Sequence, residues 1–488
     1  MSEPTRFVSR GQVMVVGPDV PHTMTVLEYL RLRLRRTGSK EGCAEGDCGA
    51  CTVVTAELSD NDRLRYRAVN ACILFVHQLD GKALFTVDDL ADEHGRLHPV
   101  QQAMVEAHAS QCGFCTPGFV MSLFAYFRGH DKADDESLKD ALAGNLCRCT
   151  GYRPILEAGH RMFGGGRDDR FAQEEAALAA LLKALATDRH RMLRHSTPEG
   201  DFIAPRSTGE LAEALDTLPA GENWLLAGGT DLGLWVTKQG RVPRSIVYLG
   251  GIAELKRIEE RADEIEIGAA VTYTDAFDAI SRLHPAFARM VRRLGSTQIR
   301  NSGTLGGNIA NGSPIGDSMP ALIALGATLK LQSKAGVRTM PLEEFFLGYR
   351  KTALKPGEFV ASVTVKKTGP QSRVGIYKLS KRFDQDISAV LAAFHVVLDG
   401  NVVKLARLAY GGMAGIPARA RQAEAALTGQ PFTPEGIEPA VAALAADFTP
   451  MSDMRASAAY RLLAAQNLLR KFCAEVGTGK PIGVEAAE

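Results

Sequence analysis

Cysteines carry the most evident chemistry in this 488-residue sequence, because eight of its nine cysteines fall within the first 149 residues. In the first set, Cys43, Cys48 and Cys51 share the glycine-rich loop GCAEGDCGAC, and Cys72 follows. Plant-type ferredoxins hold a 2Fe–2S cluster with this spacing. A zinc ion is a single small tetrahedral centre, usually held by two pairs of ligands. The pattern therefore favours an iron–sulfur cluster over zinc, disulfides or free thiols.

A second set consists of the pairs Cys112/Cys115 in QCGFCTPG and Cys147/Cys149 in NLCRCTGY. Alone, such pairs suit zinc sites and redox dithiols as well. We predict that Thr116-Pro117 begins a helix beside Cys115, since proline is favoured at the first helical position. The positive end of that helix dipole would stabilise an anionic cluster. Beside a first cluster, the second set favours another 2Fe–2S cluster.

The elements that would position these cysteines differ between the two sets. Residues 5–90 predict a small sheet, with a hairpin in RFVSRGQVMVV and strands in CTVVTAEL, RYRAVNAC and ALFTVDDL. Thr25 and Glu28 form a capping-box pattern that opens a helix over 26–34. Residues 97–163 predict four helices, and GGGRDD then breaks the chain before an alanine- and leucine-rich linker helix.

Two glycine-rich stretches further along have a second chemistry. A predicted strand runs into Gly228-Gly229, where a turn of backbone N–H groups can cradle a diphosphate. The stretch 304–317, TLGGNIANGSPIGD, has four glycines and ends in an acid. A packed helix or strand does not need so many glycines, so we expect a backbone that lies against a cofactor.

Composition limits the remaining classes of function. The chain is 45% hydrophobic and 23% charged with a net charge of +1, which is typical of a soluble protein of two to four domains and gives no electrostatic footprint for nucleic acid. We see no secretory signal and no run of about 18 apolar residues. We expect a cytoplasmic protein that does not bind a membrane, and a reducing compartment disfavours disulfides.

The motifs GCAEGDCGAC, QCGFCTPG and GNLCRCTGYRPI together resemble the iron–sulfur module of the molybdenum hydroxylases, the xanthine dehydrogenase family. The resemblance covers about residues 5–480 and implies a multidomain α+β protein. The expected parts are a ferredoxin-like β-grasp 2Fe–2S domain (5–92), a helical four-helix-bundle 2Fe–2S domain (93–163), a linker (164–196), an α+β FAD-binding domain of the vanillyl-alcohol-oxidase type (197–368) and a C-terminal α+β flavoprotein-associated domain (372–480).

The same resemblance implies the cofactor residues. The FAD set is Leu225, Leu226, Ala227, Gly228, Gly229, Thr230, Asp231, Leu232, Leu294, Thr304, Gly307, Asn308, Asp317, Val360 and Lys378. Gln111 and Cys149 match positions that approach the pterin in the family. Leu294 stands where some members have an aromatic residue near the adenine, so stacking is not expected there. Gln385 lies in a loop expected near the isoalloxazine and replaces an acid of some members, which implies a weaker negative potential at the flavin.

The sequence provides no stretch for a molybdopterin domain and needs no catalytic side chain of its own. It therefore resembles the small, iron–sulfur/FAD subunit of split xanthine dehydrogenases. We expect electrons from a molybdopterin cofactor on a large partner subunit to pass through the second cluster, the first cluster and FAD to NAD+, with purine as substrate and two copies of each chain. O2 as acceptor, an aldehyde- or N-heterocycle-oxidising relative, a freestanding NAD(P)H-dependent reductase and a zinc-stabilised interaction module remain alternatives.

Overall fold

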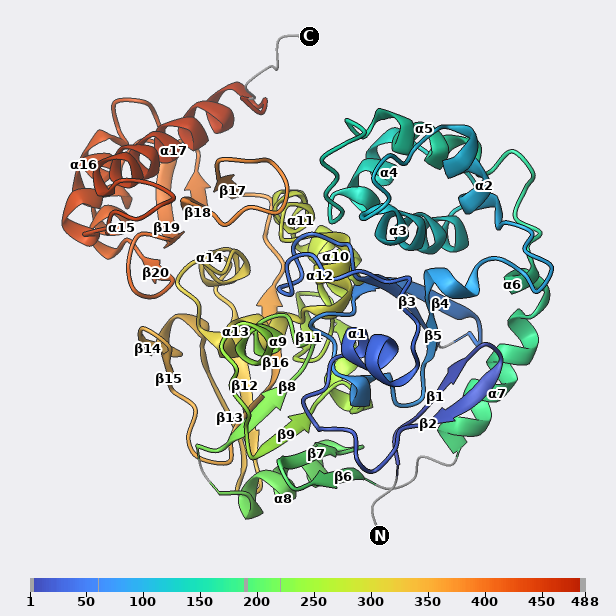
Figure 1. Ribbon diagram of the computed structural model, residues 1–488. Coiled ribbons are helices and arrows are strands. Elements are labelled where there is room, and N and C mark those ends of the chain that lie inside the picture. Colours follow the sequence, from blue (N-terminus) through green and yellow to red (C-terminus); the bar gives the residue numbers. More distant parts are fainter. Residues whose placement is uncertain (1–3, 60, 188–191, 220, 483–488) are drawn as a thin grey trace. The chain divides into compact units, whose positions relative to one another are not determined.

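The computed structural model describes residues 4–59, 61–187, 192–219 and 221–482. The chain divides into two compact units (Figure 1). The first unit contains residues 1–254 and the short return segment 295–303, and the second contains 255–294 and 304–488. The cysteine-rich third of the sequence therefore folds together with part of the glycine-rich region.

The first unit begins with a five-stranded sheet in the order β2-β1-β5-β3-β4. The predicted hairpin is confirmed, since β1 and β2 pair antiparallel from Arg6↔Val15 to Ser9↔Gln12. Thr25 and Glu28 form the predicted capping box at the start of α1, which continues as one π-helical turn over Tyr29–Arg33. The bounds are β1 Arg6–Ser9, β2 Gln12–Val15, α1 Val26–Glu28, β3 Thr52–Leu58, β4 Leu64–Asn70 and β5 Ala83–Phe85, with 3₁₀ turns at Val76–Leu79 and Val87–Asp89.

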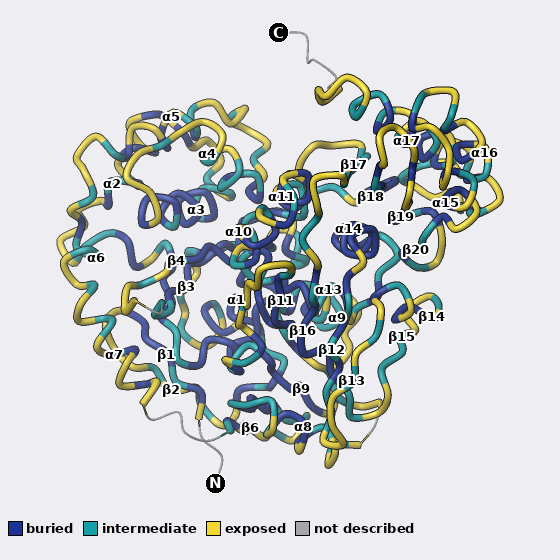
Figure 2. The backbone as a smooth tube through the Cα atoms, turned by 180° about the vertical axis from the view of Figure 1, so that it is seen from behind, coloured by how far each residue is buried: buried dark blue, intermediate teal, exposed yellow. Residues whose placement is uncertain are grey.

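Four helices follow, as the sequence predicts: α2 Pro99–Glu106, α3 Thr116–Gly129, α4 Asp135–Leu142 and α5 Arg153–Arg161. Helix α3 is the central one, because Phe119, Phe124 and Phe127 are almost fully buried and the helix is dark along most of its length in Figure 2. The N-cap of α3 is Cys115 and Thr116 is the first helical residue, so Pro117 lies one position beyond the first helical position that the sequence predicts for it. Proline still lies in the first turn, where its missing N–H leaves no bond unmade.

Two linker helices lead into a smaller sheet. The linker holds α6 Arg170–Gln173 and α7 Glu175–Thr187. The sheet has the order β6-β7-β9-β8, with β7 and β8 both parallel to β9. Its elements are β6 Leu193–Thr197, β7 Gly200–Ala204, α8 Thr208–Thr217, β8 Asn223–Leu226, α9 Leu232–Thr237 and β9 Ser245–Tyr248, and the return segment adds α12 Thr297–Ser302.

The second unit has a five-stranded sheet in the order β10-β11-β16-β12-β13 and a separate pair β14-β15. Its largest apolar core joins this sheet to the surrounding helices through Ile267, Phe287 and Leu322. The elements are β10 Ile258–Glu260, β11 Glu264–Gly268, α10 Tyr273–Leu283, α11 Pro285–Arg292, α13 Leu305–Asn311, α14 Ser318–Ala324, β12 Thr328–Ser333, β13 Gly336–Pro341, β14 Phe346–Gly348, β15 Lys351–Thr352 and β16 Phe359–Lys366.

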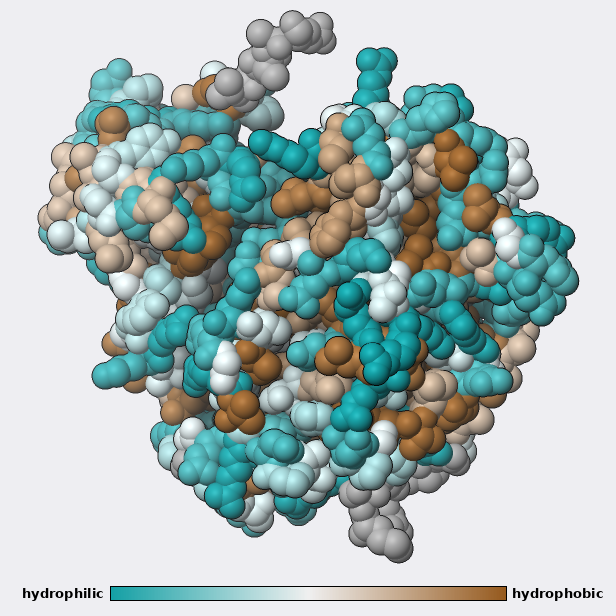
Figure 3. All heavy atoms as spheres, in the orientation of Figure 1, coloured by the Kyte–Doolittle hydropathy of each residue, from teal (hydrophilic) through white to brown (hydrophobic). Residues whose placement is uncertain are grey.

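The C-terminal part of the second unit packs three helices on a four-stranded sheet, β17-β18-β19-β20. The bounds are β17 Ser372–Leu379, β18 Val390–Asp399, β19 Val402–Gly411, β20 Ala418–Arg419, α15 Arg421–Leu427, α16 Glu438–Asp447 and α17 Ala458–Thr478. Hydrophobic residues on the face seen in Figure 3 are interrupted by hydrophilic ones. Among the described residues, no helix is both long and apolar enough to cross a membrane.

Candidate iron–sulfur and flavin sites

The first cysteine set converges on one point of the first unit. The Cys43 thiol lies within hydrogen-bonding reach of the Cys48 and Cys72 thiols, and Cys51 within reach of Cys72. Cys51 and Cys72 are 1% and 3% exposed. A Cβ atom added at Gly42 would lie 2.8 Å from Cys48 Sγ, so the loop has no room for a side chain at this position beside the sulfurs. This geometry fits four cysteine ligands around one cluster.

Backbone N–H groups of the loop point at the first sulfur. Cys43 Sγ accepts hydrogen bonds from the N–H groups of Glu45, Asp47 and Cys48, at 3.5, 3.3 and 3.3 Å. Hydrogen bonds from the neighbouring Cys48 and Cys72 thiols, and then from backbone N–H groups, lower the pKa of Cys43. Donors aimed at sulfur stabilise negative charge, so the loop is built for a thiolate ligand and raises the reduction potential of a cluster bound there.

The second cysteine set also converges, but at the surface. Cys112 pairs with Cys149 and Cys115 with Cys147 through side-chain hydrogen bonds. Cys112 and Cys149 are exposed. Burial raises the pKa of the Cys115 thiol to about 12, whereas a hydrogen bond from the Phe114 N–H is the main cause that lowers the pKa of Cys112. The two pairs of the second set therefore meet at one place.

All nine cysteines are free thiols, so the sets form no disulfides. Over the described ranges, no group of three or more histidine, cysteine or acidic side chains is arranged for a single metal ion. A 2Fe–2S cluster is held by four cysteine thiolates, which is the number that each set provides.

The two cluster loops are joined directly. The backbone N–H of Leu146, which precedes Cys147, donates to the carbonyl oxygen of Cys48 at 3.0 Å. Ile73, which follows Cys72, packs against α9. A Cβ atom added at Gly233 would lie 2.7 Å from the Ile73 carbonyl oxygen. Thr237 at the end of α9 also donates to the Ala44 carbonyl oxygen at 2.7 Å.

The predicted diphosphate loop, residues 225–232, lies in this first unit between β8 and α9. Gly229 has φ +82°, as the predicted glycine turn requires. A Cβ atom added at Gly228 would lie 1.8 Å from the Ser302 carbonyl oxygen. Gly228 is thus needed where the loop crosses the return segment. Gln78 supports the loop by donating to the Ala227 carbonyl oxygen at 3.4 Å.

The other predicted FAD residues lie in the second unit, and two of them are paired there. Lys378 Nζ lies 2.6 Å from Asp317 Oδ2, and both side chains are at most 7% exposed. Ser388 Oγ donates to the other oxygen of Asp317 at 2.5 Å. The ion pair offsets the free-energy cost of burying these two charges.

The remaining residues of the predicted FAD set in this unit also have structural roles. Thr304 caps α13 by accepting the Gly307 N–H at 3.0 Å, and Asn308 Oδ1 accepts from Ser318 at 2.9 Å. Val360 is 5% exposed in the core of the five-stranded sheet, and Leu294 packs against that core. Their packing is established, and their contact with a flavin stays a prediction.

The stretch 304–317 differs from its predicted conformation. The number of glycines predicts a backbone that lies against a cofactor and does not form a packed helix. In the structure, however, Leu305–Asn311 forms helix α13. A Cβ atom added at Gly306 would lie 2.4 Å from Ala269 Cβ, so this glycine is required by packing. Close approach of two backbone segments demands glycine as strictly as a ligand does.

The charged loop 380–387 is held by a residue that sequence reasoning missed. Arg293 donates to the carbonyl oxygens of Lys378 and Phe383 and to Ser380 Oγ, at 2.8, 3.2 and 3.0 Å. Its guanidinium also lies 4.6 Å from the centroid of the Phe383 ring. Asn70 was missed too, and it supports the first cluster loop by donating to the Gly46 carbonyl oxygen at 2.8 Å. No local motif marks either residue, because each acts on a distant segment.

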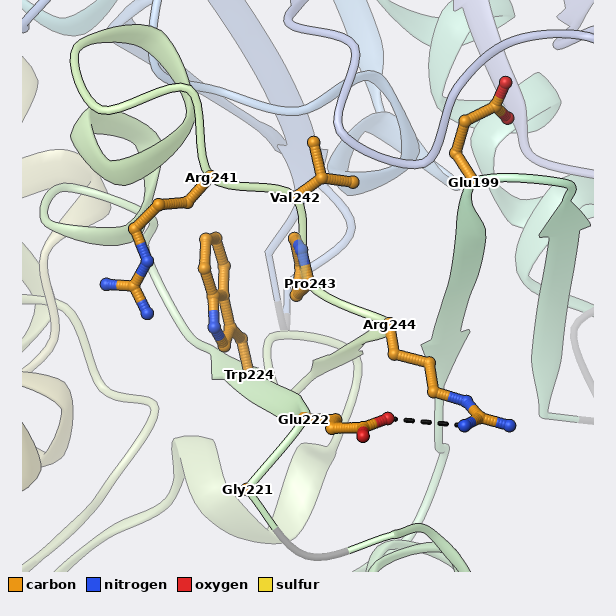
Figure 4. Close-up of a pocket in the computed structure, with 8 residues that line it drawn as sticks. All are labelled: Glu199, Gly221, Glu222, Trp224, Arg241, Val242, Pro243 and Arg244. Carbon is orange, nitrogen blue, oxygen red and sulfur yellow. Dashed lines mark hydrogen bonds and ion pairs between the residues drawn. The ribbon is translucent and has the colours of Figure 1, made fainter.

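A surface pocket of about 560 Å³ lies at the start of β8 (Figure 4). An ion pair between Arg244 and Glu222, 3.3 Å long, lies in its lining. Arg241 lies over the rings of Trp224 and Trp235, 5.1 and 4.4 Å from their centroids. The pocket contains none of the predicted cofactor residues, so it is separate from the cysteine sets.

Four protein-family models match the chain in order. They describe a 2Fe–2S iron–sulfur cluster binding domain (16–77), a [2Fe–2S] binding domain (86–160), the FAD binding domain in molybdopterin dehydrogenase (197–367) and the CO dehydrogenase flavoprotein C-terminal domain (375–476). The predicted fold class and the prediction of two 2Fe–2S domains with a flavin domain are thereby confirmed.

Comparison with whole proteins of similar sequence also finds members of this family. The chain is 34% identical to xanthine dehydrogenase of Drosophila pseudoobscura pseudoobscura over 90% of its own length, and 34% identical to xanthine dehydrogenase of Emericella nidulans over 91%. It spans 36% of each of these relatives, about a third of their length.

Chains of solved structures are also similar to part of this chain. Carbon monoxide dehydrogenase from Hydrogenophaga pseudoflava has a chain 30% identical, with a TM-score of 0.53 over 56% of this chain and 96% of that one. A chain of reconstituted CO dehydrogenase from Oligotropha carboxidovorans is 28% identical, with a TM-score of 0.52 over 55% and 93%. The chain therefore belongs to the molybdenum hydroxylase family and carries that family's two 2Fe–2S domains and FAD-binding domain.

Proposed function

We propose that this chain is the electron-transfer subunit of a xanthine dehydrogenase-like enzyme. The proposed reaction converts a purine such as xanthine, water and NAD+ into the hydroxylated purine, NADH and a proton. Its substrate site and molybdopterin would lie on a large partner chain, in a cytoplasmic assembly of two copies of each subunit. When bound here, the clusters would supply one-electron carriers and FAD would convert two electrons into a hydride.

The observation that carries this proposal is the difference in burial between the two cysteine sets. Cys112 and Cys149 are exposed, and Phe114, Leu146 and Tyr152 beside them are 49%, 47% and 40% exposed. Apolar residues around an exposed redox site are suited to a partner protein. In the first set Cys51 and Cys72 are buried and Cys43 and Cys48 are half-buried, and the neighbouring Ile73 packs against α9, next to the predicted diphosphate loop. This supports an order from partner to second set, first set and FAD.

Within this order the chain's residues bind and position the carriers. We propose that the cluster ligands are the eight cysteines of the two sets, and that FAD is held by 225–232, Leu294, Thr304, Gly307, Asn308, Asp317, Val360 and Lys378. The domain ranges proposed from the sequence are 5–92 and 93–163 for the two cysteine sets, and 197–368 and 372–480 for the FAD residues. No side chain is proposed to act as a general acid or base.

The test is purification of the native complex, with metal and cofactor analysis. About four irons and four acid-labile sulfides per chain, with one FAD and a large molybdenum-containing partner, is the expected result. Zinc in place of iron would reject an electron-transfer role. Iron and FAD with no partner, and full NADH oxidation by the single chain, would favour a freestanding reductase. Xanthine, aldehydes and N-heterocycles as substrates, each with NAD+ or O2, would then identify the reaction.

A further inference from the structure

The return segment 295–303 places a buried amide between the two cluster loops. Gln298 on α12 is 1% exposed. Its Nε2 lies 3.0 Å from Asn145 Oδ1, 3.1 Å from Ser122 Oγ and 3.3 Å from Thr52 Oγ1. These partners come from the second cluster loop, from α3 and from the strand that follows the first cluster loop. One side chain thus contacts all three elements.

Asn145 continues this network to the first cluster loop. It lies two residues before Cys147, and its Nδ2 donates to the carbonyl oxygen of Gly49, between Cys48 and Cys51, at 3.1 Å. Ser122 Oγ donates to Asn145 Oδ1 at 2.6 Å, and Thr52 Oγ1 donates to the Gly49 carbonyl oxygen at 2.6 Å. All four side chains are at most 2% exposed. Buried polar networks of this kind select one geometry, because each unmade bond is penalised.

The backbones are packed as closely as the side chains. Gly49 has φ +68°, and a Cβ atom there would lie 2.2 Å from the Gly144 carbonyl oxygen. Arg300, two residues beyond Gln298 on α12, donates to both carboxylate oxygens of Asp140 on α4, at 2.6 and 2.7 Å. The return segment therefore binds α4 of the helical domain through Arg300 and the place where the two cluster loops meet through Gln298.

We propose that Gln298 is a positioning residue for electron transfer between the two clusters: through Asn145 it holds the second cluster loop against the first. The inference rests on the proposed electron-transfer function. Gln298 touches neither set of thiols, so it acts by fixing the loops that carry them. Its segment is flanked by Leu294 and Thr304, both proposed FAD residues, which places the positioning residue within the flavin-binding stretch of the sequence.

The test replaces Gln298 by methionine, which keeps the length of the side chain and removes its hydrogen bonds. Asn301→Leu is the matched control, because Asn301 lies on the same helix and donates to the Ala68 carbonyl oxygen at 2.9 Å. In the purified full chain carrying clusters and FAD, two quantities are measured. They are the magnetic splitting between the two reduced clusters, by EPR after dithionite reduction, and the rate of electron exchange between them after a one-electron pulse.

We expect Gln298→Met to alter the splitting and to slow the exchange about tenfold, since loss of a buried hydrogen bond changes the population of the paired loops by about that factor. Asn301→Leu should leave both quantities as in the unchanged protein. Should Gln298→Met lose its iron, Ser122→Ala removes one bond of the same network and should change both quantities in the same direction by less.

Two results would overturn the inference: an unchanged splitting and rate in both Gln298→Met and Ser122→Ala, or equal changes in Asn301→Leu. Either would leave the electron-transfer function standing, provided that the unchanged protein shows two 2Fe–2S signals. Absence of those two signals in the unchanged protein would instead reject the proposed function itself.

Discussion

The two cysteine sets of the first unit provide the same kind of side chain in different surroundings. The first loop lies inside the β-grasp domain, with Cys51 and Cys72 almost fully buried. The second lies at the ends of helices, with Cys112 and Cys149 exposed. A redox centre that exchanges electrons within one chain can be enclosed, whereas one that receives them from another chain must reach the surface. Burial thus distinguishes the two loops where cysteine chemistry does not.

The largest expected difference is in the loss of a ligand. Cys72→Ser should remove the first cluster and lower the melting temperature by about 4 °C or more, because a polar hydroxyl then stands unligated in an apolar core. Cys149→Ser should remove the second cluster with little change in melting temperature. Iron analysis should find about two irons per chain in each variant. Equal melting temperatures in the two variants would contradict the comparison.

A matched pair of glycines tests the same contrast without touching a ligand. Gly49 and Gly113 lie in the two loops at φ +68° and +83°, but only Gly49 is crowded, since a Cβ atom at Gly113 would meet nothing within 4 Å. Gly113→Ala should lower the free energy of unfolding by about 1 kcal/mol through backbone strain alone. Gly49→Ala should lower it by about 3 kcal/mol through added overpacking. Denaturant unfolding measures both, and similar values would contradict the crowding of the first loop.

Much of this contrast could be predicted from residue types and spacing, and the rest could not. The Thr25 capping box, the hairpin at 6–15 and the helix beginning beside Cys115 depend on neighbours in sequence, and all three are present. The Gln298 network and the Arg293 contacts join segments more than eighty residues apart, so no local pattern could indicate them. Gly306 shows the converse: its type was noticed, but its reason depends on Ala269, a residue from another element.

Acid should weaken the two regions in different pH ranges. Beside the β-grasp sheet, His77 is fully buried 4.2 Å from the ring of His195, and burial holds the pKa of His77 well below 6.5. As the pH falls, the His77 imidazole takes up a proton in the unfolded chain before it does so in the folded protein. The free energy of unfolding therefore keeps its full value above about pH 6.5 and falls by about 1.4 kcal/mol for each pH unit below it. In the helical region burial would raise the pKa of Asp169, but hydrogen bonding to His98 and the charge of Arg128 lower it.

Asp169 therefore contributes to the free energy of unfolding above about pH 4, and this contribution is lost only below that pH. Unfolding followed from pH 8 to pH 4 should show the β-grasp region weakening first. His77→Phe keeps the ring contact and should flatten the pH dependence between 6.5 and 5, while His94→Phe, at an exposed position, should leave it unchanged. An unaltered slope in His77→Phe would assign the acid sensitivity to other groups.

The smallest expected effect is in the second unit, where a charge, and not the burial of a side chain, should change the reduction potential of the flavin. Gln385 is half-buried in the loop held by Arg293, and its carbonyl oxygen accepts from Arg382 at 3.0 Å. We propose that this loop lies near the flavin, so Gln385→Asp should lower the flavin potential and change the rate with NAD+. A partly screened charge contributes less than 1 kcal/mol, which for a two-electron couple is about 20 mV or less.

Gln430→Asp, at an exposed turn after α15, adds the same charge in the same unit and is the control. High salt should shrink the shift at Gln385, because an exposed charge is screened within about 10 Å at 0.1 M ionic strength. If the flavin potential and the NAD+ rate are both unmoved in Gln385→Asp, the loop does not face the flavin. Electrostatic tuning would then belong to the cluster loops, where N–H donors already point at Cys43.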